Sequence, residues 1–197
     1  VSVGWVRGAP TLEIAAQDPR QGVVFYELAQ QRAEAPEFRR NHVCLGCHLS
    51  WDTRGVPGLM VTSMFPLPDD PNAYANGFTT VQGSPLTQRW GGWWVTGDAG
   101  GARHMGNVPV MPVDKGKGIP NPTRTLASVD GLFNLDGYPA PYSDVVALLV
   151  LEHQAHAANL MTWLDWEARL GDTSRVRDAV EALAEVHQEV PVVFPVH

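Results

Sequence analysis

The feature that most constrains this chain is the pentapeptide CLGCH at residues 44–48, which contains both cysteines of the 197-residue sequence. Two thiols at this spacing, with a histidine directly after the second, suit the covalent attachment of a haem. Each thiol can bond one of the two vinyl groups of a porphyrin, and the imidazole then lies beneath the iron as proximal ligand. We therefore expect Cys44, Cys47 and His48 to hold one haem c.

Three other uses of the cysteine pair stay open. A zinc site needs four ligands, so Cys44 and Cys47 would have to recruit distant histidines. A redox dithiol of the thioredoxin kind is followed by a helix, and the stretch HLSWDTRGVPG at 48–58 is a poor helix former. A disulfide within the pair would close a small, strained ring. We favour haem c because nothing else in the sequence competes for the two sulfur atoms.

The rest of the sequence predicts an α+β fold. Residues 1–38 contain the runs VSVGWV, TLEIAA and GVVFYEL, bounded by Gly, Pro and Asp, which is typical of a small β region. From 52 to 142 the chain is interrupted by Gly and Pro, with short strands expected at GLMVTSMF and RWGGWWVTG. A covalent cofactor would help this loop-rich stretch to stay ordered.

The pattern becomes helical after residue 142. Ser143 and Asp144 are good N-cap residues before an apolar-periodic run that extends to about Leu170. The residues GDTS then break the helix, and Asp172 or Thr173 is expected to cap a second one. The sequence therefore predicts a C-terminal antiparallel helical hairpin.

These parts are expected to form one domain. Residues 1–142 are the β and loop-rich haem c-binding region, and residues 143–197 are the helical hairpin packed on it. The chain begins VSVGWVRG, without an initiator Met and as if inside a strand. We therefore expect it to be a piece of a longer protein.

Charge and hydropathy exclude some kinds of partner. The net charge of -7 and the pI near 5.4 argue against a surface for nucleic acid or anionic lipid. The longest apolar run of the helical part, VVALLVL at 145–151, is far shorter than a membrane span. We expect no transmembrane segment in this chain.

With His48 below the iron, function depends on the residue above it. A methionine or histidine there gives an electron carrier, and an open position gives a ligand-binding or catalytic haem. Met60 and Met64 follow the motif closely, although such methionines more often fill a core. His104 and Met105 lie in a glycine-flanked loop, where the backbone can approach a flat cofactor. Either of these two is a candidate to bind or touch the haem.

A third group of candidates lies on the long predicted helix. His153 shares a face with apolar residues, so it is expected to point inward. His156 follows one turn later, which places the two imidazoles side by side, and Glu152 is four residues before His156. A single inward histidine is usually a hydrogen-bonded core residue. Two with a carboxylate indicate either a haem ligand or a separate metal site.

Arginines near these segments are candidates to bind the two haem propionates, and tryptophans are candidates to wall the haem. The arginines are Arg39, Arg40, Arg54, Arg89 and Arg103. The tryptophans are Trp90, Trp93 and Trp94. Each arginine could equally be a surface charge, and each tryptophan could equally fill an ordinary core.

Three stretches, GVPGLMVTS, RWGGWWVTGDAGGARHMGN and SDVVALLVLEHQ, resemble a family of bacterial proteins with a single c-type haem motif, known chiefly as cytochrome c domain proteins. The resemblance runs from about residue 2 to about residue 165 and leaves out the last helix. It implies haem c, export, and a longer N-terminus, but no established reaction. It also implies that the haem site includes Arg103, His104, Met105, Gly106 and Asn107, together with Glu152 and His153.

The sequence thus predicts a monohaem c-type cytochrome, or cytochrome subunit, that carries single electrons between redox protein partners. Because haem c is attached outside the cytoplasm, we expect the periplasm or the outer face of the cytoplasmic membrane. One alternative is a haem enzyme or gas-binding protein, with His104 or His153 moving protons above an open iron. Another is a structural haem-bearing subunit of a membrane-associated complex. An electron carrier is favoured over a catalyst.

Overall fold

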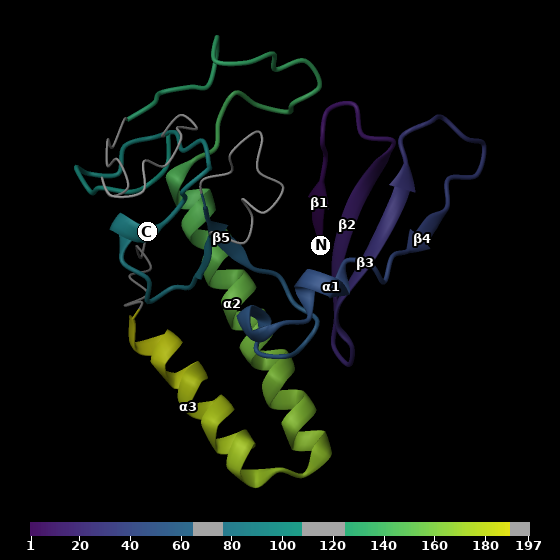
Figure 1. Ribbon diagram of the computed structural model, residues 1–197, viewed down its shortest axis with the longest axis vertical. Helices are drawn as coiled ribbons and strands as arrows, with labels where there is room; N and C mark the ends of the chain where they lie inside the picture. Colours follow the sequence, from purple (N-terminus) through teal and green to yellow (C-terminus); the bar gives the residue numbers. More distant parts are fainter. Residues whose placement is uncertain (65–76, 108–124, 190–197) are drawn as a thin grey trace, which may run out of the picture. The chain divides into compact units, whose positions relative to one another are not determined.

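The computed structural model describes residues 1–64, 77–107 and 125–189. The fold is α+β, as the sequence predicts, with two small antiparallel sheets and a C-terminal pair of helices (Figure 1). The chain divides into two compact units, each described here by itself. Unit 1 is Val1–Met60 with Ala155–His197, and unit 2 is Val61–Gln154. The sequence places a boundary between residues 142 and 143, just before the helix that begins at Val145. That residues 1–142 and 143–197 form one domain stays a prediction.

Unit 1 contains a four-stranded antiparallel sheet in the order β1-β2-β3-β4. Its strands are β1 (Ser2–Gly4), β2 (Thr11–Asp18), β3 (Gly22–Ala29) and β4 (Phe38–Arg40). Strands β2 and β3 pair along their whole length. Asp18 closes the turn between them, since its Oδ1 accepts hydrogen bonds from the amides of Arg20 and Gln21, both at 2.8 Å. The three apolar runs of the N-terminal region therefore form strands, as expected.

A glycine at the start of β3 joins this sheet to the loop that follows the cysteine motif. Gly22 has a φ of 79°, and a Cβ at this position would lie 2.4 Å from the carbonyl oxygen of Pro57. This close approach lets the amide of Val23 donate a hydrogen bond of 2.8 Å to the same carbonyl. The sheet thus supports the backbone on which the candidate site is built.

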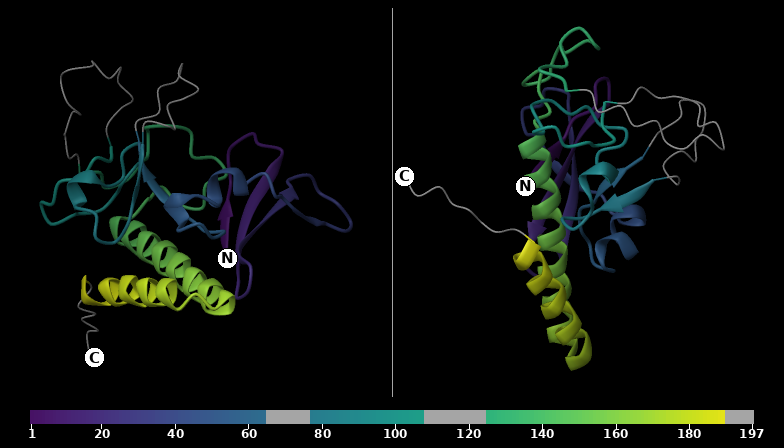
Figure 2. Two further views of the ribbon diagram at one scale, coloured as in Figure 1. Left: turned by 60° about the horizontal axis from the view of Figure 1, so that its bottom comes forward. Right: turned by 90° about the vertical axis from the view of Figure 1, so that its left-hand side faces the viewer.

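Helices α2 (Val145–Leu170) and α3 (Thr173–Glu189) form the predicted hairpin, and Figure 2 shows α3 folding back beside α2. Both helices begin at an expected aspartate. Asp144 Oδ1 accepts backbone hydrogen bonds of 2.8 and 3.3 Å, and Asp172 Oδ1 accepts bonds of 3.1 and 3.2 Å. Gly171, with a φ of 77°, provides the left-handed residue that ends α2.

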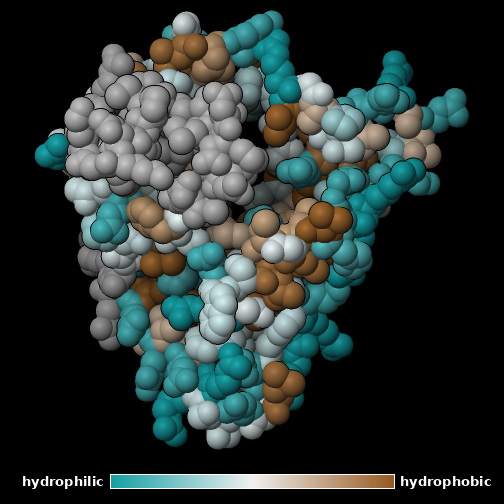
Figure 3. Space-filling view, viewed as in Figure 1, coloured by the Kyte–Doolittle hydropathy of each residue, from teal (hydrophilic) through white to brown (hydrophobic). Residues whose placement is uncertain are grey.

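The part of α2 in unit 1 packs against α3 through an apolar core, which comprises Val56, Leu160, Trp163, Ala179 and Val186. The buried positions of α3 recur at helical spacing, which explains why its other faces can be polar. In the space-filling view, the surface at the bottom, where the two helices meet, is mostly hydrophilic (Figure 3). Within the residues described, no helix combines the length and hydropathy that crossing a membrane requires.

Unit 2 contains a two-stranded sheet of β5 (Val61–Ser63) and β6 (Phe78–Thr80), a 3₁₀ turn η3 (Leu86–Gln88), and the first turns of α2. Its core comprises Trp90, Val95, Val145 and Leu148. The strand expected at RWGGWWVTG is wrong, because only Thr96 makes isolated β-bridges there. Trp90 has a φ of 67°, and the amide of Trp93 bonds back to its carbonyl at 3.0 Å, which folds the segment into a turn.

Candidate functional site

Cys44, Cys47 and His48 lie within a single helical turn in unit 1, α1 (Leu45–His48), for which Cys44 is the N-cap. Asn41, which directly follows β4, holds the entry to this turn. Its Oδ1 accepts a hydrogen bond of 2.9 Å from the amide of Val43, and its Nδ2 donates to Glu27 on β3. The spacing of the motif therefore places both sulfur atoms and the imidazole on one short, anchored turn.

His48 and Gly58 form a reciprocal pair of hydrogen bonds. The amide of Gly58 donates to the carbonyl of His48, and Nδ1 of His48 donates to the carbonyl of Gly58, each at 2.9 Å. Because a carbonyl can only accept, Nδ1 must carry the proton of the neutral ring, and Nε2 keeps its lone pair. The ring of Phe25 packs against the imidazole, with centroids 4.8 Å apart. This is the tautomer and restraint that a metal-ligating histidine requires.

The segment that carries the Gly58 carbonyl is itself held by Asn159 of α2. Asn159 is buried, and its side chain accepts a hydrogen bond from the amide of Leu59 at 3.2 Å and donates one to the carbonyl of Leu59 at 2.7 Å. A Cβ on Gly58 would lie 2.2 Å from Asn159 Oδ1, so only glycine fits there. Asn41, Gly58 and Asn159 were missed from sequence. Asn159 could have been found from the sequence, because it is a polar amide on the apolar face of a predicted helix.

The two thiols differ in their surroundings. Cys44 is half-buried and Cys47 is exposed, and neither forms a disulfide. Burial raises the pKa of the Cys44 thiol, and the negative charges of Glu13 and Glu27 raise it further. Cys44 is therefore protonated near neutral pH, whereas the attacking cysteine of a redox dithiol has a lowered pKa.

Large apolar side chains next to the motif are open to solvent. They are Val43, Leu49 and Trp51, and Trp51 is 98% exposed. A tryptophan is rarely so exposed in a folded protein, and several exposed apolar residues together indicate a surface that something else covers. The motif is therefore flanked by large apolar side chains that are exposed in the described part of the chain.

The loop with His104 and Met105 lies in unit 2. His104 is buried, its ring meets that of Trp90 edge-on at 5.3 Å, and its Nδ1 accepts a hydrogen bond of 3.0 Å from the amide of Gly106. Burial lowers the pKa of His104 below the ordinary 6.5. The ring is therefore neutral with its proton on Nε2, which is the opposite tautomer to that of His48.

The segments RWGGWWV (89–95) and RHMGN (103–107) bind one another within unit 2. The amide of Met105 donates to the carbonyl of Arg89, and the amide of Asn107 donates to the carbonyl of Trp93, both at 2.9 Å. The Asn107 side chain bonds both backbone groups of Val95, at 2.7 and 2.8 Å. Met105 is buried, with its sulfur 3.9 Å from Ser63 Oγ. These contacts give both segments a structural role.

Glu152 forms a buried ion pair with Arg89. Its Oε2 lies 2.6 Å from Arg89 Nη1, its Oε1 accepts a hydrogen bond from Thr80, and the residue is 1% exposed. Arg89 also donates to the carbonyls of Ser84 and Gln82. Both charged groups are thus engaged inside unit 2, and neither is presented to a propionate or a metal ion.

His153 and His156 fall on either side of the boundary between the units. His153 Nδ1 donates to Gln82 Oε1, so its Nε2 keeps the lone pair, as in His48. His156 is half-buried in unit 1. Among the residues that the structure describes, no three His, Cys, Asp or Glu side chains gather where a metal ion could be held. A second metal site therefore gains no support.

The remaining candidates have varied positions. Met60 and Met64 are half-buried and flank β5, while Arg39, Arg40, Arg54 and Arg103 are exposed. Trp93 donates its indole N–H to the carbonyl of Thr62 at 2.8 Å, and Trp94 is partly exposed beside Phe133. The motif and Met60 belong to unit 1, whereas Trp90, His104, Met105 and His153 belong to unit 2.

Comparison of the chain with family models, curated proteins and solved structures gives no match. The fold and the site define an α+β protein with a CxxCH turn whose histidine is oriented by a backbone carbonyl.

Proposed function

We propose that this protein carries one covalent haem c on Cys44, Cys47 and His48 and passes single electrons between redox partners. The observation that carries the proposal is the hydrogen bond from His48 Nδ1 to the Gly58 carbonyl. It fixes the ring with the Nε2 lone pair available, and it makes the imidazole a stronger donor to a metal. When bound, the haem supplies an iron that gains and loses one electron.

The chain's own residues fit this group. The two thiols lie on the same turn as the imidazole and are not joined to each other, so each can form a thioether to one vinyl group. Val43, Leu49 and Trp51 offer exposed apolar surface beside them. Phe25 and Gly58 hold the imidazole in place, which would keep the proximal side unchanged between oxidation states.

The other uses of the cysteine pair are less well supported. The raised pKa of Cys44 works against a dithiol that attacks disulfides, because only the thiolate attacks. Zinc would need further His, Cys, Asp or Glu ligands beside the cysteine pair. Among the described residues, no three side chains of these types lie close enough together to hold a metal ion. Haem attachment uses only the two thiols, one for each vinyl group, and His48 as the axial ligand, all of which lie on the same turn.

The distal ligand stays a prediction among His104, Met105 and His153. Coordination through Nε2 requires a proton on Nδ1, which His153 has and His104 lacks. His104 would have to lose its bond to the amide of Gly106 before it could bind iron in this way. A filled distal position, by any of the three, would favour electron transfer over catalysis.

The location and the partners follow from the cofactor. We propose the periplasm or the outer face of the cytoplasmic membrane, where haem c is attached, with redox proteins as partners. One alternative is a haem enzyme with an open iron, which the following spectrum would reveal. The other is a structural haem-bearing subunit of a membrane-associated complex, which co-purification with a larger assembly would reveal.

The test is the absorption spectrum of natively exported protein, oxidised and reduced, with and without carbon monoxide. We expect a low-spin haem spectrum that carbon monoxide leaves unchanged, and haem that stays on the chain through denaturation. The Cys44→Ala, Cys47→Ala double variant should lose covalent haem. The matched His48→Ala variant should keep it but change spin state, because only the axial ligand is removed.

Each other result has a definite meaning. A high-spin spectrum that shifts with carbon monoxide would indicate an open position and replace electron transfer with ligand binding or catalysis. Haem that survives denaturation in the double cysteine variant, or exported protein without any haem, would refute the proposal.

A further inference from the structure

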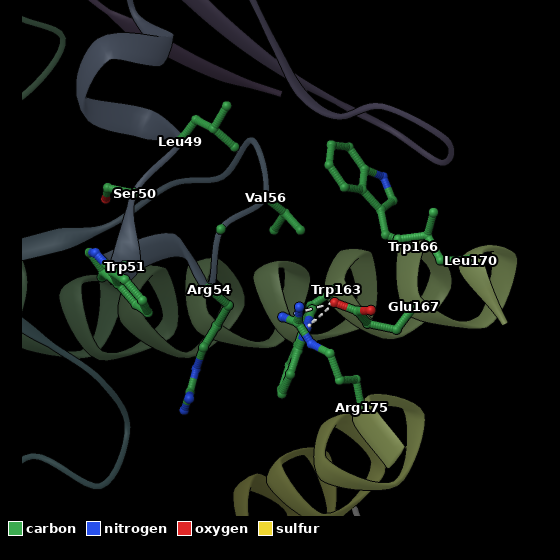
Figure 4. A pocket seen from close by; sticks show the side chains of 11 residues that line it. Leu49, Ser50, Trp51, Arg54, Val56, Trp163, Trp166, Glu167, Leu170 and Arg175 are labelled. Atoms are coloured by element: carbon green, nitrogen blue, oxygen red, sulfur yellow. Dashed lines mark hydrogen bonds and ion pairs between the residues drawn. The ribbon is translucent and has the colours of Figure 1, made fainter. Parts of the chain in front are cut away.

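A pocket of about 840 Å³ opens in unit 1 beside the cysteine turn. Its volume lies in the range of small-molecule sites, about 300–1,000 Å³. The pocket lies between the loop that follows α1 and the neighbouring ends of α2 and α3, and Figure 4 shows Val56 on that loop and Trp166 on α2 lining it. Neither Cys44, Cys47 nor His48 lines it.

The wall of this pocket is aromatic and its rim is apolar. Three tryptophans line it: Trp51, Trp163 and Trp166. Leu49 and Leu170 also line it, and both are exposed, at 43% and 76%. Trp51 is 98% exposed, whereas Trp163 is 9% exposed and belongs to the core of unit 1. The open face of Trp51 therefore favours a planar apolar ligand.

The pocket is lined by two arginines, Arg54 and Arg175, and one glutamate, Glu167. Arg175 of α3 reaches Glu167 of α2 in an ion pair of 2.9 Å, drawn as a dashed line in Figure 4. Glu167 also accepts the indole N–H of Trp163 at 2.9 Å. Arg54 lies over the ring of Trp163, 5.8 Å from its centroid, and forms no ion pair with any described residue. The pocket therefore carries a net positive charge in a protein whose net charge is -7.

The backbone holds Arg54 at this place. Its φ of 62° lies in the left-handed region that few residues other than glycine adopt. The amide of Arg54 bonds to the carbonyl of Trp51 at 3.1 Å, and the amide of Gly55 bonds to that of Ser50 at 2.8 Å. A strained position that the surroundings fix is a recurrent feature of ligand sites.

We propose that this pocket binds a planar aromatic carboxylate, with the ring against the exposed indole of Trp51 and the carboxylate on the guanidinium of Arg54. A guanidinium on an aromatic face and a carboxylate are complementary in charge and geometry. Two sources share this chemistry. One is a free aromatic acid, and the other, which rests on the proposed function, is the propionate edge of a haem attached to Cys44 and Cys47.

The first arm titrates native protein with 2-naphthoate in a calorimeter. If the ligand is free, wild-type protein binds it, and Arg54→Gln weakens binding about tenfold, the effect of losing one charge-assisted bond. Trp51→Ala should weaken binding several-fold, and this side chain is too exposed to be needed for folding. The control Arg32→Gln changes an exposed arginine that does not line the pocket and is not a candidate for binding a propionate, and it should leave binding unchanged.

The second arm applies if native protein carries haem and does not bind naphthoate. A propionate that loses Arg54 has a higher pKa, so Arg54→Gln should move the pH-dependent part of the haem midpoint potential to higher pH. Arg32→Gln should leave this pH dependence unchanged. Naphthoate binding that ignores Arg54, or the absence of both Arg54 effects, would overturn the proposal. The naphthoate titration does not need haem. The proposed function is tested separately by the absorption spectrum, so the failure of one proposal can be told apart from the failure of the other.

Discussion

Asn159 and Asn107 each bond both backbone groups of one residue, Leu59 in unit 1 and Val95 in unit 2. An amide side chain has one acceptor and two donor hydrogens, so it can imitate the edge of a neighbouring strand. In this chain of short strands, the two asparagines satisfy backbone groups in loops that no sheet covers. They fix the loop behind His48 and the loop that carries His104.

Gly58→Ala should destabilise the protein by about 2 kcal/mol, since the new Cβ would displace an amide held by two hydrogen bonds. The clash is with Asn159 Oδ1, only 2.2 Å from the Cβ position. The matched control is Gly46→Ala on α1, where a Cβ meets nothing within 4 Å. Chemical denaturation measures both, and equal effects would mean that Asn159 does not hold this segment.

His104 should make stability fall in mild acid. Burial lowers its pKa in the folded state, so below about pH 6.5 the unfolded chain binds a proton that the folded chain resists. The free energy of unfolding then falls as pH decreases, at no more than about 1.4 kcal/mol per pH unit for one proton. Above that pH the two states bind protons equally at this residue, and the effect vanishes.

The comparison uses His104→Asn, because Asn Oδ1 can still accept from the amide of Gly106 and does not titrate. Denaturation curves at pH 7.5 and pH 5.5 should show a smaller acid loss for the variant than for wild-type protein. An identical loss would contradict the assignment of a neutral, buried His104.

Glu152 of helix α2 forms a buried ion pair with Arg89, which follows the 3₁₀ turn η3. Glu152→Gln would leave the guanidinium of Arg89 buried without a counter-charge, so we expect a loss of about 3 kcal/mol in the free energy of unfolding. Glu185→Gln, on the exposed side of α3, should change it by less than about 0.5 kcal/mol. A small effect at both positions would show that Arg89 is satisfied by backbone carbonyls alone.

The elements differ in how far the sequence could reveal them. The start of each helix of the hairpin can be predicted from sequence, because the caps Asp144 and Asp172 bond to backbone amides only two or three residues away. The segment RWGGWWVTG has the composition of a strand, yet it turns at Trp90 because the buried ring and its contacts outweigh local preference. Tertiary packing of this kind leaves no periodic signal.

The same division holds for the candidate site. The CLGCH turn was visible because its spacing is a local property of the chain. The acceptor for His48 Nδ1 is a backbone carbonyl ten residues later, and every residue type has such a carbonyl. Glu152 was recognised as a candidate but is engaged with Arg89, 63 positions away, which only the fold could reveal.

At the scale of the whole molecule, two separate apolar cores correspond to the two compact units. Leu160 is fully buried in the core of unit 1, and Leu160→Ala should cost about 3 kcal/mol. Amide hydrogen exchange should then accelerate more in α3 and β3 than in residues 89–95 of unit 2, because local opening follows cooperative units. Equal acceleration everywhere would mean that the chain unfolds as one unit.

The raised pKa of Cys44 also has a consequence for timing. Disulfide exchange proceeds through the thiolate, so a thiol that stays protonated is slow to be oxidised. In an oxidising compartment, the folded turn would delay its own closure into a disulfide and lengthen the period in which both sulfur atoms remain reactive toward another acceptor. Burial of Cys44, and after it the negative charges of Glu13 and Glu27, would then slow the oxidation of the cysteine pair.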